Sequence, residues 1–142
     1  MDWTDPHDPR WTPLLDAAWA ARERAHAPYS GFKVGAALIT GDGRVVAGCN
    51  VENASYPMCT CAERVAVCAA AAGGMRPGGL AALAVVTEAD TLTPPCGACR
   101  QVLAEFAEGL PILLANRQAR ACFDLEALLP EAFRGRNFLP PT

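Results

Sequence analysis

Three cysteines, placed at the expected starts of two helices, constrain this chain more than any other feature of its sequence. Cys61 begins one helix-forming stretch, and Cys96 and Cys99 form a Pro-Cys-x-x-Cys motif that begins another. Two thiolates in a first helical turn point toward one spot, and a third from a second helix leaves one tetrahedral position for water. Catalytic zinc sites have this open arrangement. We therefore expect one Zn²⁺ per chain, bound by Cys61, Cys96 and Cys99.

Glu63 and Arg64 closely follow the first of these cysteines. Because Glu63 lies two residues after Cys61, its carboxylate can reach a water at the open position without binding the metal. Glu63 is therefore the candidate catalytic group, a carrier of protons. Three thiolates on one Zn²⁺ leave a net negative charge, which weakens the ion as a Lewis acid. Helix N-termini and the Arg64 guanidinium would offset this charge, so Arg64 is interpreted as a charge-tuning residue.

The cysteine motifs also allow other interpretations. Redox dithiols and structural zinc sites share a bare Cys-x-x-Cys, and a closed four-cysteine site could use Cys59 or another spare thiol as its fourth ligand. Glu63 would then have no role. A non-catalytic zinc module for protein interaction is a second alternative. The Cys-Ala-Glu and Pro-Cys-x-x-Cys motifs together favour the open catalytic site over both.

The apolar periodicity, with its Pro and Gly breaks, predicts an α/β protein. Stretches with helical apolar spacing or helix-forming composition alternate along the chain with strand-like apolar runs. The expected helices are 12–27, 61–72, 96–109 and a short one within 124–129, and the expected strands are 33–40, 44–50, 80–87 and 111–116. This order predicts a mixed central sheet with helices on both faces, a three-layer α-β-α sandwich.

Length and charge narrow the class of protein further. The 142 residues fit a single domain over 1–142, with 1–10 as a loose N-terminal arm. The net charge of −3 argues against nucleic acid as a partner, because nucleic-acid binders need a basic surface. No apolar run is long enough to cross a membrane, and the first residues lack the pattern of a signal peptide. We therefore expect a cytoplasmic protein, whose seven cysteines are metal ligands or buried thiols.

Four motifs in this order resemble the small homotetrameric cytidine deaminases, and the resemblance extends from about Pro28 to Phe133. Agreement on all four is too extensive for chance. The motifs are Ala-Pro-Tyr-Ser-Gly-Phe-Lys-Val-Gly-Ala-Ala at 27–37, Asn-Val-Glu-Asn-Ala-Ser-Tyr at 50–56, Cys-Ala-Glu-Arg at 61–64 and Pro-Cys-Gly-Ala-Cys-Arg-Gln at 95–101.

The resemblance implies a cytidine deaminase-like fold and the hydrolytic deamination of cytidine and deoxycytidine to uridine and deoxyuridine, with release of ammonia. It also implies a homotetramer and a nucleoside pocket. In this family the counterparts of Asn50 and Glu52 hydrogen-bond the ribose 3′-hydroxyl, and the counterpart of Phe32 packs on the pyrimidine. If Asn50 and Glu52 were left unpaired by a smaller ligand, they would discriminate strongly for a nucleoside. Further residues of the expected pocket are Val51, Ala54 and Tyr56.

The C-terminal part departs from the family pattern. The family has Leu-Leu-Pro-x-x-Phe-Gly-Pro, with the Phe reaching a neighbouring subunit's active site, whereas here Arg-Gly follows Phe133. Phe133 is the expected counterpart, and Phe138 is an alternative for the same contact. A further alternative concerns the substrate, because blasticidin-type deaminases share the zinc motif. The ribose-binding pair Asn50 and Glu52 argues for a nucleoside instead.

Overall fold

The structure is a computed structural model that describes residues 3–140. Helices and strands alternate through this part of the chain. The helices are α1 (Thr12–Arg22), α2 (Ala62–Ala72), α3 (Gly97–Phe106) and α4 (Leu125–Leu128); the strands are β1 (Gly35–Thr40), β2 (Val45–Cys49), β3 (Leu80–Val86), β4 (Pro111–Ala115) and β5 (Arg120–Asp124). Short 3₁₀ turns occupy Pro9–Trp11, Tyr56–Met58 and Gly135–Asn137.

Within residues 3–140, one sheet holds the five strands in the order β2-β1-β3-β4-β5. β3 and β4 are parallel and the other neighbouring pairs are antiparallel, so the predicted mixed sheet is confirmed. The parallel pair follows from the connection between the two strands, because α3 crosses from the end of one to the beginning of the next. The hairpin of β1 and β2 turns at Gly43, whose φ of 89° suits glycine.

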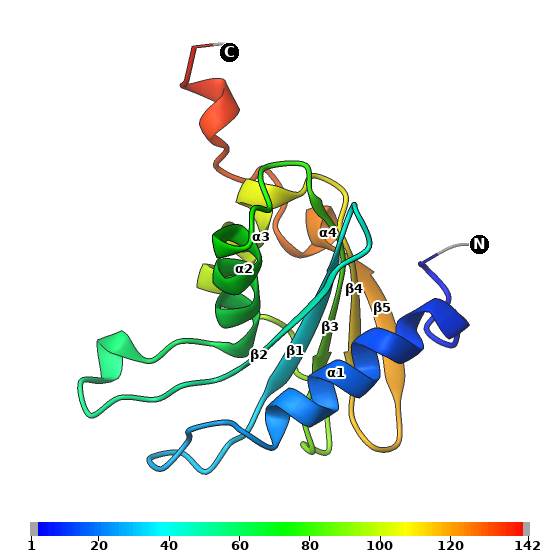
Figure 1. Cartoon of the computed structure of the whole chain (residues 1–142), viewed down its shortest axis with the longest axis vertical. Helices are drawn as coiled ribbons and strands as arrows, with labels where there is room; N and C mark the ends of the chain where they lie inside the picture. Colours follow the sequence, from blue (N-terminus) through cyan, green and yellow to red (C-terminus); the bar gives the residue numbers. More distant parts are fainter. Residues whose placement is uncertain (1–2, 141–142) are drawn as a thin grey trace.

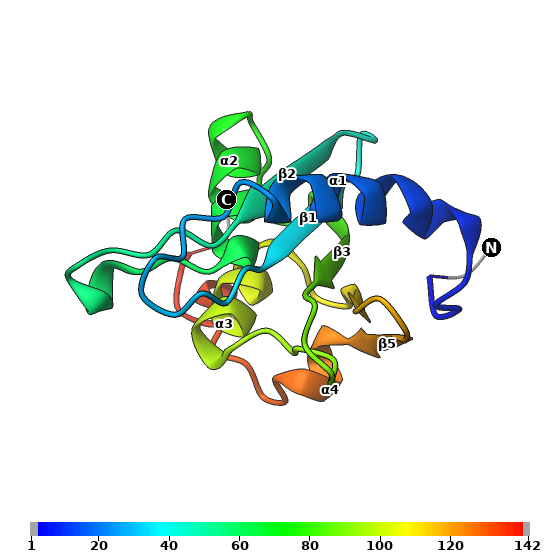
Figure 2. The same ribbon diagram turned by 90° about the horizontal axis from the view of Figure 1, so that it is seen from below.

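Helices cover both faces of this sheet, as predicted. Figures 1 and 2 show α1 on one side and α2 with α3 on the other. Successive side chains of β1 alternate between two cores: Ala36 and Leu38 pack on the side of α2 and α3, whereas Ala37 packs on the side of α1. All three are fully buried.

Two glycines allow the helices to approach the sheet closely. A Cβ atom on Gly35 of β1 would lie 2.0 Å from the carbonyl oxygen of Ala18 in α1. On the opposite face, a Cβ atom on Gly48 of β2 would lie 2.6 Å from the carbonyl oxygen of Ala62 and from the amide nitrogen of Ala66, both in α2. Since α2 begins directly after Cys61, this close packing places the first turn of α2 over the sheet edge.

Two elements differ from the sequence-based expectation. Helix α1 ends at Arg22 and not near residue 27, because the backbone of His26 pairs with the neighbouring segment: its N–H donates to the Asn50 carbonyl at 3.0 Å, and its carbonyl accepts from the Glu52 N–H at 2.8 Å. Strand β5 was not expected at all. It is a short edge strand, half-exposed along its length, and it lacks the apolar run that identifies buried strands.

The packed part of the chain begins before Thr12, earlier than expected. The ring of Trp3 lies edge-on against Trp11, with ring centroids 4.6 Å apart, and Trp11 is fully buried. Residues 1 and 2 of the expected arm lie outside the described residues. Among residues 3–140, no helix is long and apolar enough to cross a membrane.

Candidate metal centre and substrate pocket

The structure brings together the three cysteines singled out in the sequence. Cys61 caps the N-terminus of α2, Cys96 caps that of α3, and Cys99 lies in the first turn of α3. Their Sγ atoms all lie within 4.8 Å of one another, with 3.8 Å between Cys61 and Cys96 and 3.4 Å between Cys96 and Cys99. Tetrahedral Zn–S bonds of about 2.3 Å place sulfurs about 3.8 Å apart, so the donor set fits Zn²⁺.

Positive groups surround these thiols. The Arg64 Nη2 atom lies 3.5 Å from the Cys61 Sγ atom, and both helices direct their N-termini at the cluster. Hydrogen bonding from the Cys99 thiol, followed by that from Arg64, lowers the pKa of Cys61 to about 5. The pKa of Cys99 is raised instead, first by its bond to Cys61 and then by burial. A thiolate is therefore favoured at Cys61, next to the guanidinium.

Glu63 is buried in the first turn of α2 and is 4% exposed. Burial raises the pKa of its carboxyl above the ordinary value, and the negative charge of Cys61 raises the pKa further. A carboxyl with a raised pKa both accepts and returns protons readily near neutral pH. Its position in the same pocket as Cys61 suits proton transfer at a ligand beside the thiols.

A pocket of about 310 Å³ opens next to the thiols, within the size range of small-molecule sites. Its wall combines four separate stretches of chain with Val85 of β3. These stretches contribute Ser30, Phe32 and Val34; Asn50 and Glu52; Cys59, Thr60, Cys61, Ala62 and Glu63; and Thr93, Pro94 and Cys96. The pocket thus brings Phe32, Asn50 and Glu52, the residues that the family resemblance indicated, together with the metal-binding candidates.

Other predicted residues lie away from this pocket. Among the described residues that line it, Val51, Ala54 and Tyr56 do not occur. The Tyr56 side chain is 66% exposed and meets Tyr29 edge-on, with ring centroids 5.6 Å apart. Phe133 also lies elsewhere, stacked on Phe138 with a centroid distance of 4.8 Å. Within one chain, these side chains therefore do not complete the pocket.

The polar groups of Asn50 and Glu52 are already hydrogen-bonded, which corrects the expectation that they stay unpaired without a sugar. The Asn50 side chain accepts from the Val34 N–H at 2.9 Å and donates to the Phe32 carbonyl at 2.7 Å. The Glu52 carboxylate accepts from the backbone N–H groups of residues 29 and 30 at 2.9 and 3.1 Å, and from the Ser30 hydroxyl. The hydrogen bond from the Ser30 hydroxyl is the largest cause of the lowered pKa of Glu52.

Sequence reasoning missed Ser30 as a pocket residue. Its hydroxyl also accepts a hydrogen bond from the Phe32 N–H at 3.0 Å. A signal was present in the sequence, because a serine directly before a glycine in a loop is a residue type that hydrogen-bonds nearby backbone. Gly31 indeed has a φ of 68°.

Of two further cysteines, Cys59 agrees with the open site favoured from the sequence, whereas Cys68 differs from its expectation. Cys59 lies outside the three-thiol group; its Sγ atom accepts from the Asn53 N–H at 3.3 Å and lies 3.7 Å from the Asn53 carbonyl oxygen. This position gives no support to a closed site with Cys59 as fourth ligand. Cys68 was expected to be buried but is exposed on α2.

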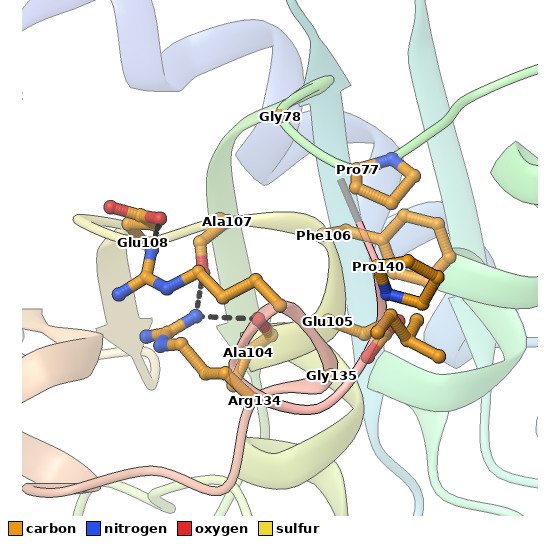
Figure 3. Close-up of a pocket in the computed structure, with 12 residues that line it drawn as sticks. Pro77, Gly78, Ala104, Glu105, Phe106, Ala107, Glu108, Arg134, Gly135 and Pro140 are labelled. Carbon is orange, nitrogen blue, oxygen red and sulfur yellow. Dashed lines mark hydrogen bonds and ion pairs between the residues drawn. The ribbon is translucent and has the colours of Figure 1, made fainter. Parts of the chain in front are cut away.

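A larger concavity, of about 770 Å³, lies at the other end of α3 (Figure 3). There the Arg134 guanidinium donates to the carbonyl groups of Ala104 and Ala107 at 2.6 and 3.0 Å, and Arg136 pairs with Glu108. These bonds attach the C-terminal segment to the end of α3. The lining of this concavity includes none of the three clustered thiols, so the smaller pocket is the candidate functional site.

Comparisons with known proteins agree with this geometry. A sequence model of the family described as "Cytidine and deoxycytidylate deaminase zinc-binding region" matches residues 12–112. A cytidine deaminase of Sporosarcina psychrophila is 48% identical over 126 residues, which cover 84% of this chain and 88% of that protein. A cytidine deaminase of Mycobacterium tuberculosis (strain H37Rv) is 47% identical over 134 residues, covering 94% and 96%. The 1.6 Å crystal structure of cytidine deaminase from Burkholderia pseudomallei has a TM-score of 0.83 and 55% identity, and the match covers 86% of this chain and 98% of that one.

Proposed function

The chain belongs to the cytidine and deoxycytidylate deaminase family, and on this basis we propose that it catalyses the zinc-dependent hydrolytic deamination of cytidine and deoxycytidine. The products are uridine or deoxyuridine and ammonia. The observation that carries the proposal is the convergence of three thiols with a buried carboxyl, Glu63, at one wall of a nucleoside-sized pocket. A merely structural zinc site has no need of such a carboxyl.

In this proposal Cys61, Cys96 and Cys99 hold one Zn²⁺. The ion, when bound, supplies a Lewis acid that makes water nucleophilic toward C4 of the pyrimidine. Glu63 takes the proton of that water and protonates N3 of the ring. Glu63 then takes the proton of the hydroxyl group added at C4 and delivers it to the amino group, which leaves as ammonia as the C4 carbonyl forms. Arg64 and the two helix N-termini offset the thiolate charge, supported by the 3.5 Å contact between Arg64 and Cys61.

Substrate recognition is assigned to lining residues of the pocket outside the metal centre. Phe32 packs on the pyrimidine, and Asn50 and Glu52 bind the ribose 3′-hydroxyl through hydrogen-bonding capacity that their internal bonds leave free. All three side chains line the pocket with the thiols. For Val51, Ala54 and Tyr56, the support is the family resemblance alone.

The test of this function is cytidine turnover, followed by the absorbance change on deamination and by ammonia release. We expect turnover with about one zinc per chain and loss of turnover after chelation, restored by added Zn²⁺. Cytosine and blasticidin S serve as comparison substrates and should react far more slowly. One zinc per chain with no ammonia from any of the three compounds would instead indicate the non-catalytic zinc module.

The proposal includes assembly and location. A homotetramer in which Phe133 reaches a neighbouring subunit's pocket agrees with the exposure of Phe133, Phe138 and Leu139, each about two-thirds exposed in the isolated chain. Figure 1 shows the C-terminal segment standing away from the sheet, where a second chain has access to it. Cytoplasmic location stays an expectation from the sequence.

A further inference from the structure

Two loops form the substrate side of the pocket, and polar side chains fasten one to the other. Figures 1 and 2 both show the segment that follows α1 beside the segment that follows β2. Glu52 on the second loop accepts two backbone N–H groups and the Ser30 hydroxyl from the first. Asn50 bonds the backbone of Phe32 and Val34.

Phe32 depends on these bonds for its position, because packing alone does not fix it. Its side chain is 42% exposed, and it follows Gly31, whose φ of 68° lies in the left-handed region. The backbone of Phe32 is held at both ends: its carbonyl accepts from Asn50 at 2.7 Å, and its N–H donates to the Ser30 hydroxyl at 3.0 Å. Ser30 thus secures one of the two attachment points of the ring.

The Ser30 hydroxyl has a partner on either side. It donates its proton to the Glu52 carboxylate while its oxygen accepts from the Phe32 N–H. A bond to a carboxylate polarises the hydroxyl and strengthens the bond that it accepts. One hydroxyl group therefore links the residue assigned to the sugar with the residue assigned to the base.

We propose that Ser30 is a positioning residue for the substrate pocket. Through its hydroxyl group, Ser30 holds the ring of Phe32 and the carboxylate of Glu52 in one fixed relation. This inference rests on the proposed function of the pocket. In this role Ser30 takes no part in the chemical steps and need not touch the reacting atoms. Its effect is on the binding of the nucleoside, while Glu63 and the thiols are unaffected.

The experiment compares Ser30→Ala with Ser30→Thr, which keeps the hydroxyl. For Ser30→Ala we expect KM for cytidine to rise about tenfold, equivalent to about 1.4 kcal/mol, with kcat within about twofold of wild type. A loss of this size matches the removal of a hydrogen bond to a charged group. Ser30→Thr should keep KM within about twofold of wild type. Ser55→Ala, at the other serine of the chain, is the matched control, since Ser55 is exposed and does not line the pocket.

A second measurement needs no turnover. In the nucleoside-free protein, the backbone amide of Phe32 should exchange with solvent about tenfold faster in Ser30→Ala than in wild type or Ser30→Thr, as followed by NMR. The melting temperature should fall by no more than about 3 °C, since the loop is exposed and a single hydrogen-bonding group is removed.

Several results would overturn the inference while leaving the proposed function intact. They are an unchanged KM in Ser30→Ala, a Ser30→Thr variant that behaves like Ser30→Ala, and a loss confined to kcat. A large fall in melting temperature would show a global structural role instead. If wild-type protein deaminates no nucleoside, the proposed function fails, and the amide exchange of Phe32 still decides whether Ser30 orders this loop.

Discussion

The carboxyl of Glu63 lies where one wall of the pocket meets the first turn of α2, buried beside the Cys61 thiol. Burial and the neighbouring thiolate act in the same direction, and both raise the pKa of Glu63. A surface carboxylate stays ionised at neutral pH, where it is a weak base that is rarely protonated and so rarely has a proton to donate. The local environment, and not the residue type alone, therefore suits Glu63 to both halves of a proton relay.

Replacing this carboxyl should separate metal binding from catalysis. In Glu63→Ala we expect zinc content to stay at the wild-type level, because none of the three thiols is altered. Turnover should fall by about a thousandfold or more, since general acid and base catalysis are both lost. Zinc analysis and cytidine kinetics on the same preparation provide the measurement. Near-normal turnover would refute the assignment of Glu63.

The lowered pKa of Glu52 predicts a dependence of stability on pH. A carboxyl whose pKa is lower in the folded protein stabilises the fold at every pH above its ordinary pKa of 4.5. This contribution is lost as the pH falls through the pKa of the folded state. Wild type should therefore be more stable than Glu52→Gln at pH 7, and the difference should shrink below about pH 4. Urea unfolding of both proteins at pH 7, 5 and 3.5 measures it. A difference that grows on acidification would contradict the assigned sign.

At the scale of elements, the two faces of the sheet share one packing device. α1 lies against Gly35 and α2 against Gly48, and in both cases backbone atoms of the helix occupy the space that a Cβ would need. Because Cys61 caps α2, the distance between α2 and β2 also determines where the first thiol lies.

Adding one methyl group at this contact should therefore affect both stability and the metal centre. In Gly48→Ala the new Cβ would lie 2.6 Å from two backbone atoms of α2, neither of which can rotate away. We expect a loss of about 3 kcal/mol in the free energy of unfolding, the upper end of the range for overpacked sites. Urea unfolding measures this loss, and zinc retention should weaken in parallel.

Gly41→Ala is the matched control for that experiment. The nearest atom to a Cβ at Gly41 is 3.9 Å away, an ordinary contact, so the substitution should change the free energy of unfolding by less than about 1 kcal/mol. Equal losses in the two variants would show that close approach of α2 is not the cause.

Features that depend on residues close together in the sequence were predicted more accurately than features that depend on residues far apart. The starts of α2 and α3 are governed by local signals, and the three thiols converge as predicted. The end of α1 depends on backbone bonds from His26 to a distant segment, which no local pattern contains. β5 pairs with the neighbouring strand β4, and it was missed because it is an edge strand without an apolar run. Ser30 had a local signal as a residue that bonds nearby backbone, but its place in the pocket depends on Glu52, which is 22 residues away. Phe32, Asn50 and Glu52 came from the family resemblance, not from any physical pattern.

For the whole molecule, the thiol cluster joins segments that are far apart in the sequence. Cys61 and Cys96 are 35 residues apart, and a metal bound between them ties α2 to α3. A ligand that binds only the folded protein stabilises it in proportion to the logarithm of its concentration over Kd. Loss of zinc should therefore lower the stability of the folded protein.

We expect zinc removal to lower the melting temperature by about 10 °C, which corresponds to a few kcal/mol in a protein of this size. Calorimetry with and without a chelator, followed by readdition of Zn²⁺, measures the change. Cys61→Ala should melt like the chelated protein and respond little to chelator. Cys68→Ala, which removes an exposed thiol from the same helix, should behave as wild type. A chelator effect in Cys61→Ala as large as in wild type would count against this ligand set.

The oligomeric state is the second property of the whole molecule that can be tested. Light scattering should give a mass close to four chains. Phe133→Ala should reduce cytidine turnover by about tenfold or more, because in the proposed tetramer it removes an apolar contact from the neighbouring pocket. Phe123→Ala removes another exposed aromatic ring, on β5, and serves as the control. A stable monomer with full activity would remove both the tetramer and the role of Phe133.

The bonds from Glu52 and Asn50 to the loop at residues 29–34 also bear on the thermodynamics of ligand association. Because this wall is ordered before a nucleoside arrives, the entropy of fixing its backbone is lost during folding and not during binding. Such preorganisation means that the heat capacity change of association should reflect little more than the apolar surface that the nucleoside and the pocket bury against each other. The wall is thus a rigid template and not a flap that closes over its ligand.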